Sequence, residues 1–449
     1  MTRPSDLATR VLDIVGRLGP GAEATVTVTR QSLALTRFAE SFIHQNVAEE
    51  TDRIQLQVHV DGRTATAETN QGSPEALSAL VSSALSAAAL RPADTTYPGL
   101  VAPTRLVAMG NWDESTGRAE PAARAAVVRA FVDAAAGLSC AGYCQTVGAE
   151  VAFANTAGQA VAARTSEASL SAIARTGRSD GVARGSGVAL SSVDGAQLGA
   201  AAAAKARAGM EQVELAPGRY EVVLESGAVS DVVGGLLFQG LNGKAVAEGR
   251  SFAEVGAAQF DPAVSLWDDS TDTQASGLPF DAEGTPKRRV DLVTAGVTTA
   301  VSHDRRTAAA CGTSSTGHAV PGGERWGAFP SDVRLAGGSA DDLVAGVQRG
   351  LLVTDFWYTR ALDPKTLVYT GLTRNGVWLI EDGKLGAAVS TLRFTQSYVD
   401  ALAPGAVLGV SRATWPMPDG VAPIASGTGS LIVPSLRLAA WNITGGAAG

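Results

Sequence analysis

The stretch "VELAPGRYEVVLES", residues 213–226, divides the sequence into two halves of different character. A short connection containing Pro217 and Gly218 interrupts the preceding pattern, and a strongly apolar run, residues 220–224, follows it directly. Adjacent proline and glycine mark a turn or linker more often than the interior of an element. A chain of 449 residues is also long for one ordinary domain. We therefore predict two domains, residues 1–213 and 214–449.

Helical and strand patterns alternate before this stretch. Apolar residues recur at helical spacing over residues 5–19, and Ser73 stands as an N-cap before a helix that ends near Pro92. Further helices are expected over residues 121–137 and 194–210. Strand patterns lie between them, including the alternating run 53–70, in which Asp61 and Gly62 close a hairpin. The first domain is therefore expected to be α+β, an antiparallel sheet with helices.

The sequence after residue 226 is mainly of strand type. One clear helix is expected over residues 227–243, and a short helix capped by Ser339 is expected near Asp341 and Asp342. Strand runs separated by turn residues follow the first helix. They cover residues 288–301, 350–360, 376–383 and 429–438. The second domain is therefore expected to be mostly β, with a barrel-like sheet.

Composition excludes several functional classes. The chain carries 36 basic and 44 acidic residues, a net charge of −8, and has no basic run suited to a nucleic acid backbone. The chain has three cysteines, Cys140, Cys144 and Cys311. A small and odd number of cysteines argues against a disulfide framework. No apolar run is long enough for a membrane span, and no signal-peptide pattern is present. We expect a cytoplasmic protein with no nucleic acid or membrane partner.

The histidines argue against a local zinc motif. There are four, His44, His59, His303 and His318, and the two closest pairs are each separated by 15 residues. Catalytic zinc sites usually take two ligands from one helix, about one turn apart. No helix of this chain can carry such a pair. We therefore predict no metal ligand in this chain, although a site assembled from distant ligands stays open; that it has no catalytic residue is implied only by the family resemblance given below.

Polar residues on two glycine-rich loops are the candidate contacts for a ligand. Asp281 and Glu283 lie two residues apart in "FDAEG", where paired carboxylates can do acid–base work or simply fix the loop. The segment 302–319 combines histidine, aspartate, cysteine and hydroxyls, yet matches no local signature of nucleophilic catalysis. We interpret the segment 302–319 as a loop that contacts a peptide and the Asp281 and Glu283 segment mainly as a cluster that fixes its loop, and both supply candidate residues for a peptide-contacting wall. The candidate residues are Asp281, Glu283, Thr313, Ser314, Ser315 and His318.

Three segments, in order, resemble the TldD/PmbA (TldD/TldE) family of peptidase proteins. The clearest is "SGLPFDAEGTPKRRVDLVTAGVTTAV", residues 276–301, and the others are residues 349–390 and the amino-terminal hairpin 41–63. TldD-type chains of this family carry an H-E-x-x-x-H helix and a later cysteine, which together hold zinc. In "GGLLFQGLNGKAVAEGRSF", residues 234–252, this sequence has the helix without those ligands. It therefore resembles the TldE/PmbA type.

The resemblance implies a subunit of a two-chain zinc metallopeptidase. Zinc is expected in a TldD-like partner, and this chain would help to enclose unfolded or short peptides for cleavage there. A peptide could be held as an added strand, since backbone hydrogen bonds demand little of its sequence. Two alternatives stay open. One is a stand-alone homo-oligomeric protein that binds a peptide or metabolite. The other is an enzyme that works through the His303 to His318 segment or the Asp281 and Glu283 pair.

Overall fold

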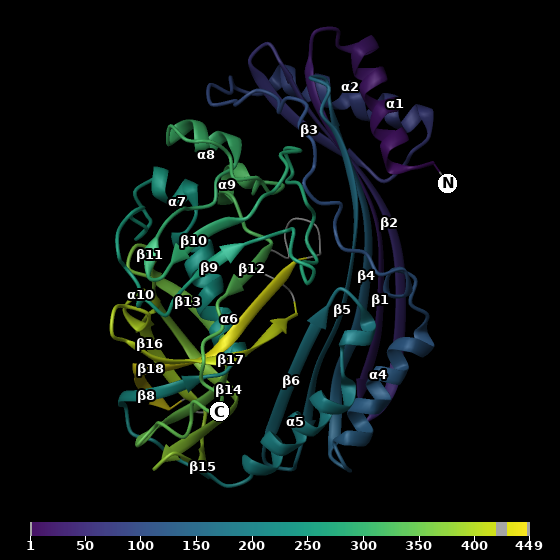
Figure 1. The fold of residues 1–449 in the computed structure, drawn as a ribbon. Helices are drawn as coiled ribbons and strands as arrows, with labels where there is room; N and C mark the ends of the chain where they lie inside the picture. The colour runs from purple at the N-terminus through teal and green to yellow at the C-terminus, as the bar shows by residue number, and fades with distance from the viewer. Residues whose placement is uncertain (1, 419–428, 447–449) are drawn as a thin grey trace.

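A computed structural model describes residues 2–418 and 429–446 of the chain (Figure 1). The amino-terminal half forms a six-stranded antiparallel sheet in the order β3-β2-β1-β4-β5-β6. Its strands are β1 Glu23–Ala39, β2 Phe42–Val60, β3 Arg63–Thr69, β4 Ser139–Asn155, β5 Ala160–Arg175 and β6 Asp180–Gly187. Its helices are α1 Pro4–Leu18, α2 Pro74–Leu90, α3 Glu114–Gly117, α4 Pro121–Ala134, η1 Leu190–Ser192 and α5 Gly195–Ala208.

Local signals in the sequence explain the ends of several of these elements. Ser73 accepts a hydrogen bond from the amide of Ala76 and begins α2, as an N-cap residue does. Asp61 and Gly62 both have positive φ, 50° and 72°, which is the backbone of a tight two-residue hairpin between β2 and β3. Glu40 and Ser41 turn the chain between β1 and β2 in the same left-handed region.

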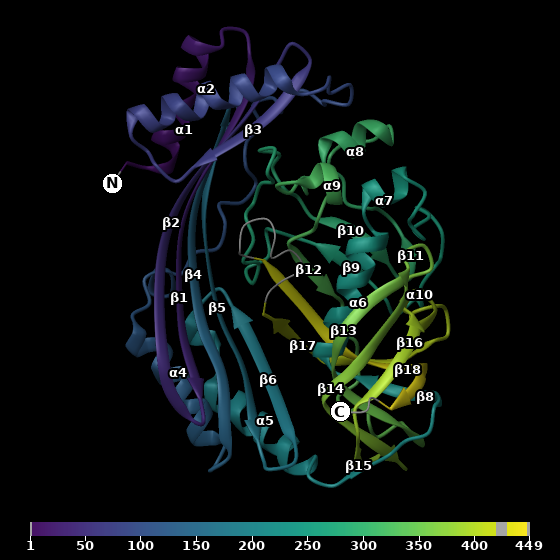
Figure 2. The ribbon, with the colours of Figure 1, turned by 180° about the vertical axis from the view of Figure 1, so that it is seen from behind.

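Strand β4 presents side chains to both faces of the sheet, since successive side chains of a strand point to opposite sides. Both faces of the strand are buried. Its even-numbered residues, such as Cys140 and Cys144, pack under α4 and α5. Its odd-numbered residues, Val151 and Phe153 among them, pack on the other face with Leu278 of the carboxy-terminal half. The amino-terminal sheet therefore carries helices on one face and supports the second half on the other. Figure 2 shows the long strands running beside that half.

The carboxy-terminal half is built on a second, twelve-stranded sheet. Its strands are β7 Gln212–Val213, β8 Gly218–Leu224, β9 Leu266–Asp268, β10 Val290–Thr294, β11 Val297–Thr298, β12 Asp332–Leu335, β13 Arg349–Asp363, β14 Val368–Glu381, β15 Lys384–Val389, β16 Leu392–Ser397, β17 Val407–Met417 and β18 Ser430–Gly446. Its helices are α6 Ser226–Gly235, the π-helical turn η2 Leu236–Gly240, α7 Gly243–Ala247, α8 Arg305–Ala310, α9 Gly323–Trp326 and α10 Tyr398–Ala401.

Five of these strands pair in a closed ring, β8-β13-β14-β16-β18 and back to β8. The expected barrel-like, mostly β architecture is therefore present. Phe356 stacks on Trp441 within its core, Phe394 packs at an angle against both, and Trp441 is fully buried. Helix α6 packs its valines against the same core. In the described part of the chain, every helix is too short or too polar to cross a membrane.

The short helix expected near Ser339 is not formed. Residues 339–348 make turns and bends, and the Asp342 carboxylate accepts hydrogen bonds from the amides of Val344 and Ala345. An aspartate that bonds the backbone two or three residues ahead stabilises a turn, which competes with a helix. The prediction of a helix here was wrong for this reason.

Candidate functional site

The loops that carry the predicted site residues lie against the amino-terminal sheet. Residues 276–286 pack on β4, where Phe280 joins Val151 and Phe153 in one buried cluster. Gly284 makes this approach possible, because a Cβ there would lie 2.2 Å from a ring carbon of Phe153 and its φ is +76°. The side chain of Gln159 donates a hydrogen bond of 2.9 Å to the Gly284 carbonyl. The candidate loops are thus fixed by contacts between the two halves.

A buried contact joins the imidazole of His318 to the carboxylate of Asp268 at the centre of these loops. Nε2 of His318 lies 3.0 Å from Oδ1 of Asp268, and both side chains are fully buried. The other carboxylate oxygen of Asp268 accepts the amides of Ser331 and Asp332, at 2.8 and 2.7 Å. Burial alone would raise the pKa of Asp268, yet the His318 imidazole beside it lowers that pKa to about 2. Asp268 is therefore ionised; two amides satisfy its Oδ2, whereas its Oδ1 lies close to Nε2 of His318 without the geometry of a hydrogen bond.

A second carboxylate, Asp332, lies next to this pair and shares a lysine with it. Nζ of Lys287 donates to the Ser331 hydroxyl at 2.5 Å, and that hydroxyl donates to Asp332 at 2.8 Å. The amide of Gly277 also donates to Asp332, at 2.8 Å. Burial raises the pKa of Asp332. The cluster thus alternates charges and hydrogen-bond donors, which is how buried polar groups are stabilised.

Asp281 and Glu283, the predicted carboxylate pair, do different things. Asp281 is buried and accepts three backbone amides, those of Glu283, Thr285 and Ala319, at 2.9 to 3.0 Å. Glu283 is only half-buried as a residue, and its carboxylate accepts the amide of Arg305 at 3.0 Å. Burial of the carboxyl, with the Asp281 charge beside it, raises the pKa of Glu283 to about 8. Asp281 fixes the loop, whereas Glu283 holds a titratable proton near neutral pH.

The hydroxyl residues of the second loop lie nearer the surface. Thr313 and Ser314 are exposed, and Ser315 is half-buried with its hydroxyl donating to the His303 carbonyl at 3.2 Å. The loop thus places Thr313 and Ser314 outside and His318 inside. Contact of these six residues with a peptide stays a prediction.

His318 also contacts a threonine hydroxyl. The hydroxyl, the imidazole and the Asp268 carboxylate follow one another as the three groups of a catalytic triad do. Nδ1 of His318 lies 2.8 Å from Oγ1 of Thr316, while Nε2 faces Asp268. The Thr316 hydroxyl, however, accepts the amide of His303 at 2.7 Å and lies 3.0 Å from the carbonyl of the same residue. A nucleophile must have a free path to its substrate. This hydroxyl is buried and already bonded, so the group is a structural network in the present conformation.

Sequence analysis missed the residues that join this cluster to the amino-terminal sheet. Glu167 of β5 accepts the Ser276 hydroxyl at 3.2 Å and the amide of Gly429 at 3.3 Å. Asn111 donates to the carbonyls of Asp272 and Ala275, each at 2.8 Å. Single polar residues in strands and loops carry no local signal of such contacts. Only their burial in the folded chain shows the role.

Helix α6 is the second feature on which the functional argument depends. Its valines and the leucines of η2 are buried in the barrel core. Its one acid, Asp231, accepts the hydroxyl of Tyr398 at 2.5 Å and that of Thr359 at 2.7 Å. Burial raises the pKa of Asp231, and Tyr398 in turn stacks on Tyr369 with ring centroids 4.4 Å apart. The apolar side chains of the helix are thus packed in the core, and its acid is hydrogen-bonded within the chain.

The described residues do not fit a zinc site. Across residues 2–418 and 429–446, no three histidine, cysteine or acidic side chains lie together in a way that could hold a metal ion. Cys140 and Cys144 are buried, and burial raises the pKa of both thiols, to about 12 for Cys144. A metal ligand must be deprotonated, so these thiols are poor ligands.

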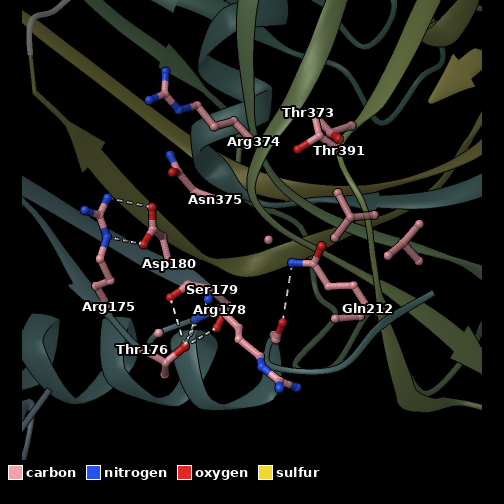
Figure 3. Close-up of a pocket in the computed structure, with 16 residues that line it drawn as sticks. Arg175, Thr176, Arg178, Ser179, Asp180, Gln212, Thr373, Arg374, Asn375 and Thr391 are labelled. Atoms are coloured by element: carbon pink, nitrogen blue, oxygen red, sulfur yellow. Dashed lines mark hydrogen bonds and ion pairs between the residues drawn. The ribbon is translucent and has the colours of Figure 1, made fainter. Parts of the chain in front are cut away.

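Two cavities lie between the halves, away from the His318 cluster. One, of about 410 Å³, is bordered by the β5–β6 turn and by strands β14 and β15 (Figure 3). The other, of about 240 Å³, is bordered by β6 and α5 on one side and by the start of α6, Trp415 and Met417 on the other. The ion pairs Arg184–Asp355 and Lys205–Glu225, each at 2.7 Å, cross between the halves beside the second cavity.

A family model and several solved structures match this chain. A model described as the PmbA/TldA metallopeptidase C-terminal domain matches residues 217–445. No curated protein sequence matches this chain. Among solved structures, TldE from Thermococcus kodakarensis superposes with a TM-score of 0.84 at 17% identity, covering 98% of this chain and 99% of that one.

Two bacterial structures have the same fold. A protein from Bacteroides thetaiotaomicron gives a TM-score of 0.82 at 19% identity and covers 98% of both chains. One from Thermotoga maritima gives 0.81 at 17% identity and covers 98% of this chain and 99% of that one. Both are described as proposed modulators of DNA gyrase. At such identities the likeness establishes the fold along nearly the whole chain, and nothing more specific.

Proposed function

The chain belongs to the PmbA/TldD metallopeptidase family, and from this premise we propose that it is a TldE-type, non-catalytic subunit of a two-chain zinc peptidase. The active subunit would be a TldD-like chain bearing the H-E-x-x-x-H helix. The present chain would help to enclose unfolded or short peptides and position them for cleavage by that partner. We propose a cytoplasmic complex, which is consistent with three cysteines, all free.

The observation that carries this proposal is the chemistry of α6 and η2. In TldD-type chains of the family that this sequence resembles, the zinc motif lies on the corresponding helix. In this chain, α6 and η2 contain no histidine, cysteine or glutamate. Its one acid is held by the hydroxyls of Tyr398 and Thr359. A ligand carboxylate would need to be free to turn toward a metal. We therefore propose that the helix has a structural role and that the partner carries out the hydrolysis.

The loops around the His318 cluster are proposed as the wall that meets the peptide. Thr313 and Ser314 are exposed on this wall, and hydroxyls can exchange hydrogen bonds with a peptide backbone. Behind them, the contacts of Asp281 and His318 hold the loops in one conformation. A rigid support for exposed polar contacts limits the entropy lost on binding. The wall would accept many sequences, as a peptidase of unfolded chains requires.

The decisive experiment is purification of the tagged chain from its native cell, followed by mass spectrometry of whatever is recovered in equal amount. We expect a chain that bears H-E-x-x-x-H. Peptide cleavage is then measured for this chain alone, for the partner alone, and for both together, with and without a zinc chelator. Chelator-sensitive cleavage should need the partner and rise at least tenfold when both are present.

Two results would contradict the proposal. Recovery of the chain only as a homo-oligomer would favour a stand-alone protein that binds a peptide or metabolite. Cleavage by this chain alone, lost in His318→Ala, would assign catalysis to the buried His318 and Asp268 pair instead.

A further inference from the structure

The cavity of about 410 Å³ lies at the opposite end of the carboxy-terminal half from Thr313 and Ser314. Figure 1 shows α8, which directly precedes those residues, at one end and β15 at the other. The cavity is bordered by the turn 175–180 of the amino-terminal half and by residues 373–377 of β14. It is therefore formed jointly by the two halves and is distinct from the wall discussed above.

The charges around this cavity do not cancel. Arg175 is neutralised by Asp180, with two contacts of 2.7 and 3.0 Å. Arg178 and Arg374 also border the cavity, and no carboxylate in the described parts of the chain lies within ion-pair distance of either. Figure 3 shows them on opposite sides of the cavity, Arg374 above and Arg178 below. Two exposed arginines without a carboxylate partner among the described residues thus stand at the rim of the cavity, with their guanidinium groups directed away from each other.

An exposed aromatic pair continues the surface beside Arg374. The guanidinium of Arg374 lies over the ring of Trp357, 4.0 Å from its centroid, and Tyr358 packs edge-on against Trp357 at 5.2 Å. These aromatic residues are 46% and 65% exposed although they are consecutive in β13. Alternation along a strand would direct one of them to the opposite face. Tyr358 has φ of +53°, and the pairing of β13 with β14 shifts register here, so a bulge disturbs that alternation.

This conformation is costly, which points to a use. A bulky residue in the left-handed region is unfavourable, and exposing two aromatic rings forgoes their burial. Strained backbone persists mainly where function requires it. Tryptophan, tyrosine and arginine are also the residues that dominate binding surfaces. A ligand of this surface would therefore meet both the arginines and the aromatic pair.

We propose that this surface, defined by Arg178, Arg374, Trp357 and Tyr358, binds an acidic, extended polypeptide segment. Carboxylates of the segment would pair with the two arginines on opposite sides of the cavity, and an apolar side chain next to the Arg374 contact would pack on the aromatic pair. A nucleic acid fits less well, because binding of a phosphate backbone depends on many cationic contacts, whereas two arginines match a segment with two carboxylates. The site needs no zinc subunit, so this inference stands apart from the proposed function.

The test uses the full chain and a fluorescein-labelled peptide of glutamate and leucine, with a matched peptide in which glutamine replaces glutamate. Binding is followed by fluorescence anisotropy at low and moderate salt. We expect the glutamate peptide to bind at least about tenfold more tightly than the glutamine peptide, and to weaken as salt rises. The double variant Arg178→Gln/Arg374→Gln should lose at least about tenfold in affinity. Trp357→Ser should lose at least about threefold with both arginines intact.

The matched control is Arg10→Gln/Arg17→Gln, which removes two exposed, unpaired charges from α1 at the far end of the molecule. It should bind as the unmodified chain does. If this control lost as much affinity for the glutamate peptide as Arg178→Gln/Arg374→Gln does, the change in net charge alone would explain the loss. That result would overturn the proposal. So would equal affinity for the two peptides, or no binding of the glutamate peptide. Tighter binding of single-stranded RNA with the same arginine dependence would replace the peptide by a nucleic acid. None of these results bears on the TldD-like partner.

Discussion

At the scale of single residues, buried acids give this chain its most specific chemistry. Glu283 has a pKa raised to about 8, so the folded chain holds its proton where the unfolded chain has lost it. Stability from this group is fully present below the unfolded pKa of about 4.5 and is lost as pH rises toward 8. Between pH 5 and pH 7 the unmodified chain should lose about 1–3 kcal/mol of unfolding free energy relative to Glu283→Gln.

Urea denaturation of both chains at several pH values measures this difference. Glu49→Gln on β2 serves as the control, because the Glu49 side chain is exposed to solvent. A pH dependence that is identical in the unmodified chain and in Glu283→Gln would show that the Glu283 carboxyl is ionised throughout.

Asp231 permits a second prediction at this scale. In Asp231→Ala the hydroxyls of Tyr398 and Thr359 lose their common acceptor inside the barrel. A buried donor left without a partner costs about 1–3 kcal/mol, and we expect that loss in unfolding free energy. Asp13→Ala on the exposed face of α1 should change it by less than about 0.5 kcal/mol. Equal effects of the two substitutions would mean that Asp231 is solvated.

At the scale of elements, an irregular segment of the amino-terminal half is fastened to α8. The carboxylate of Asp94 accepts two hydrogen bonds from Arg306, at 2.8 and 3.0 Å. The guanidinium of Arg305 donates to the carbonyls of Pro98 and Leu100, each at 3.0 Å. Arg306 lowers the pKa of Asp94 well below its usual range. Planar arginine contacts of this kind fix both partners better than a single charge does.

A double-mutant cycle on Asp94 and Arg306 should give a coupling energy of about 1 kcal/mol, since both side chains are partly shielded from water. Hydrogen exchange over residues 92–113 should also speed up in Arg306→Ala while that in α2 stays unchanged. The exposed pair Arg3–Asp6 is the control, with a coupling near zero. Faster exchange throughout the chain would show that the contact supports global stability instead.

The same scale shows what could be predicted from the sequence. Ser73, Asp61 and Gly62 specify their elements locally, and the structure confirms the α2 cap and the β2–β3 hairpin. His318 shows the limit, because its partner Asp268 lies 50 positions earlier and no local pattern joins the two. The loop that contains His318 reads as polar and surface-exposed, yet the fold buries its final residues. Long-range pairing, and not propensity, decides which loop residues face solvent.

At the scale of the whole molecule, the close approach of the 276–286 loop to β4 sets how the two halves sit together. A Cβ at Gly284 would lie 2.2 Å from Phe153, and the residue also has φ of +76°. Gly284→Ala therefore adds a collision between the halves to the cost of a left-handed alanine. Gly62 has a similar φ of +72°, and nothing lies within 4 Å of the corresponding position. The pair Gly284→Ala and Gly62→Ala thus separates packing from backbone conformation.

We expect Gly62→Ala to lower the unfolding free energy by about 1 kcal/mol, the cost of the left-handed conformation alone. Gly284→Ala should lower it by about 2–4 kcal/mol, because overpacking of a close-packed interface adds to that cost. Urea denaturation measures both values. Small-angle scattering should show a larger radius of gyration for Gly284→Ala only, since relief of the collision moves the loop and its sheet away from β4. Equal losses in the two variants, with unchanged scattering, would show that the halves adjust locally and that Gly284 does not set their arrangement.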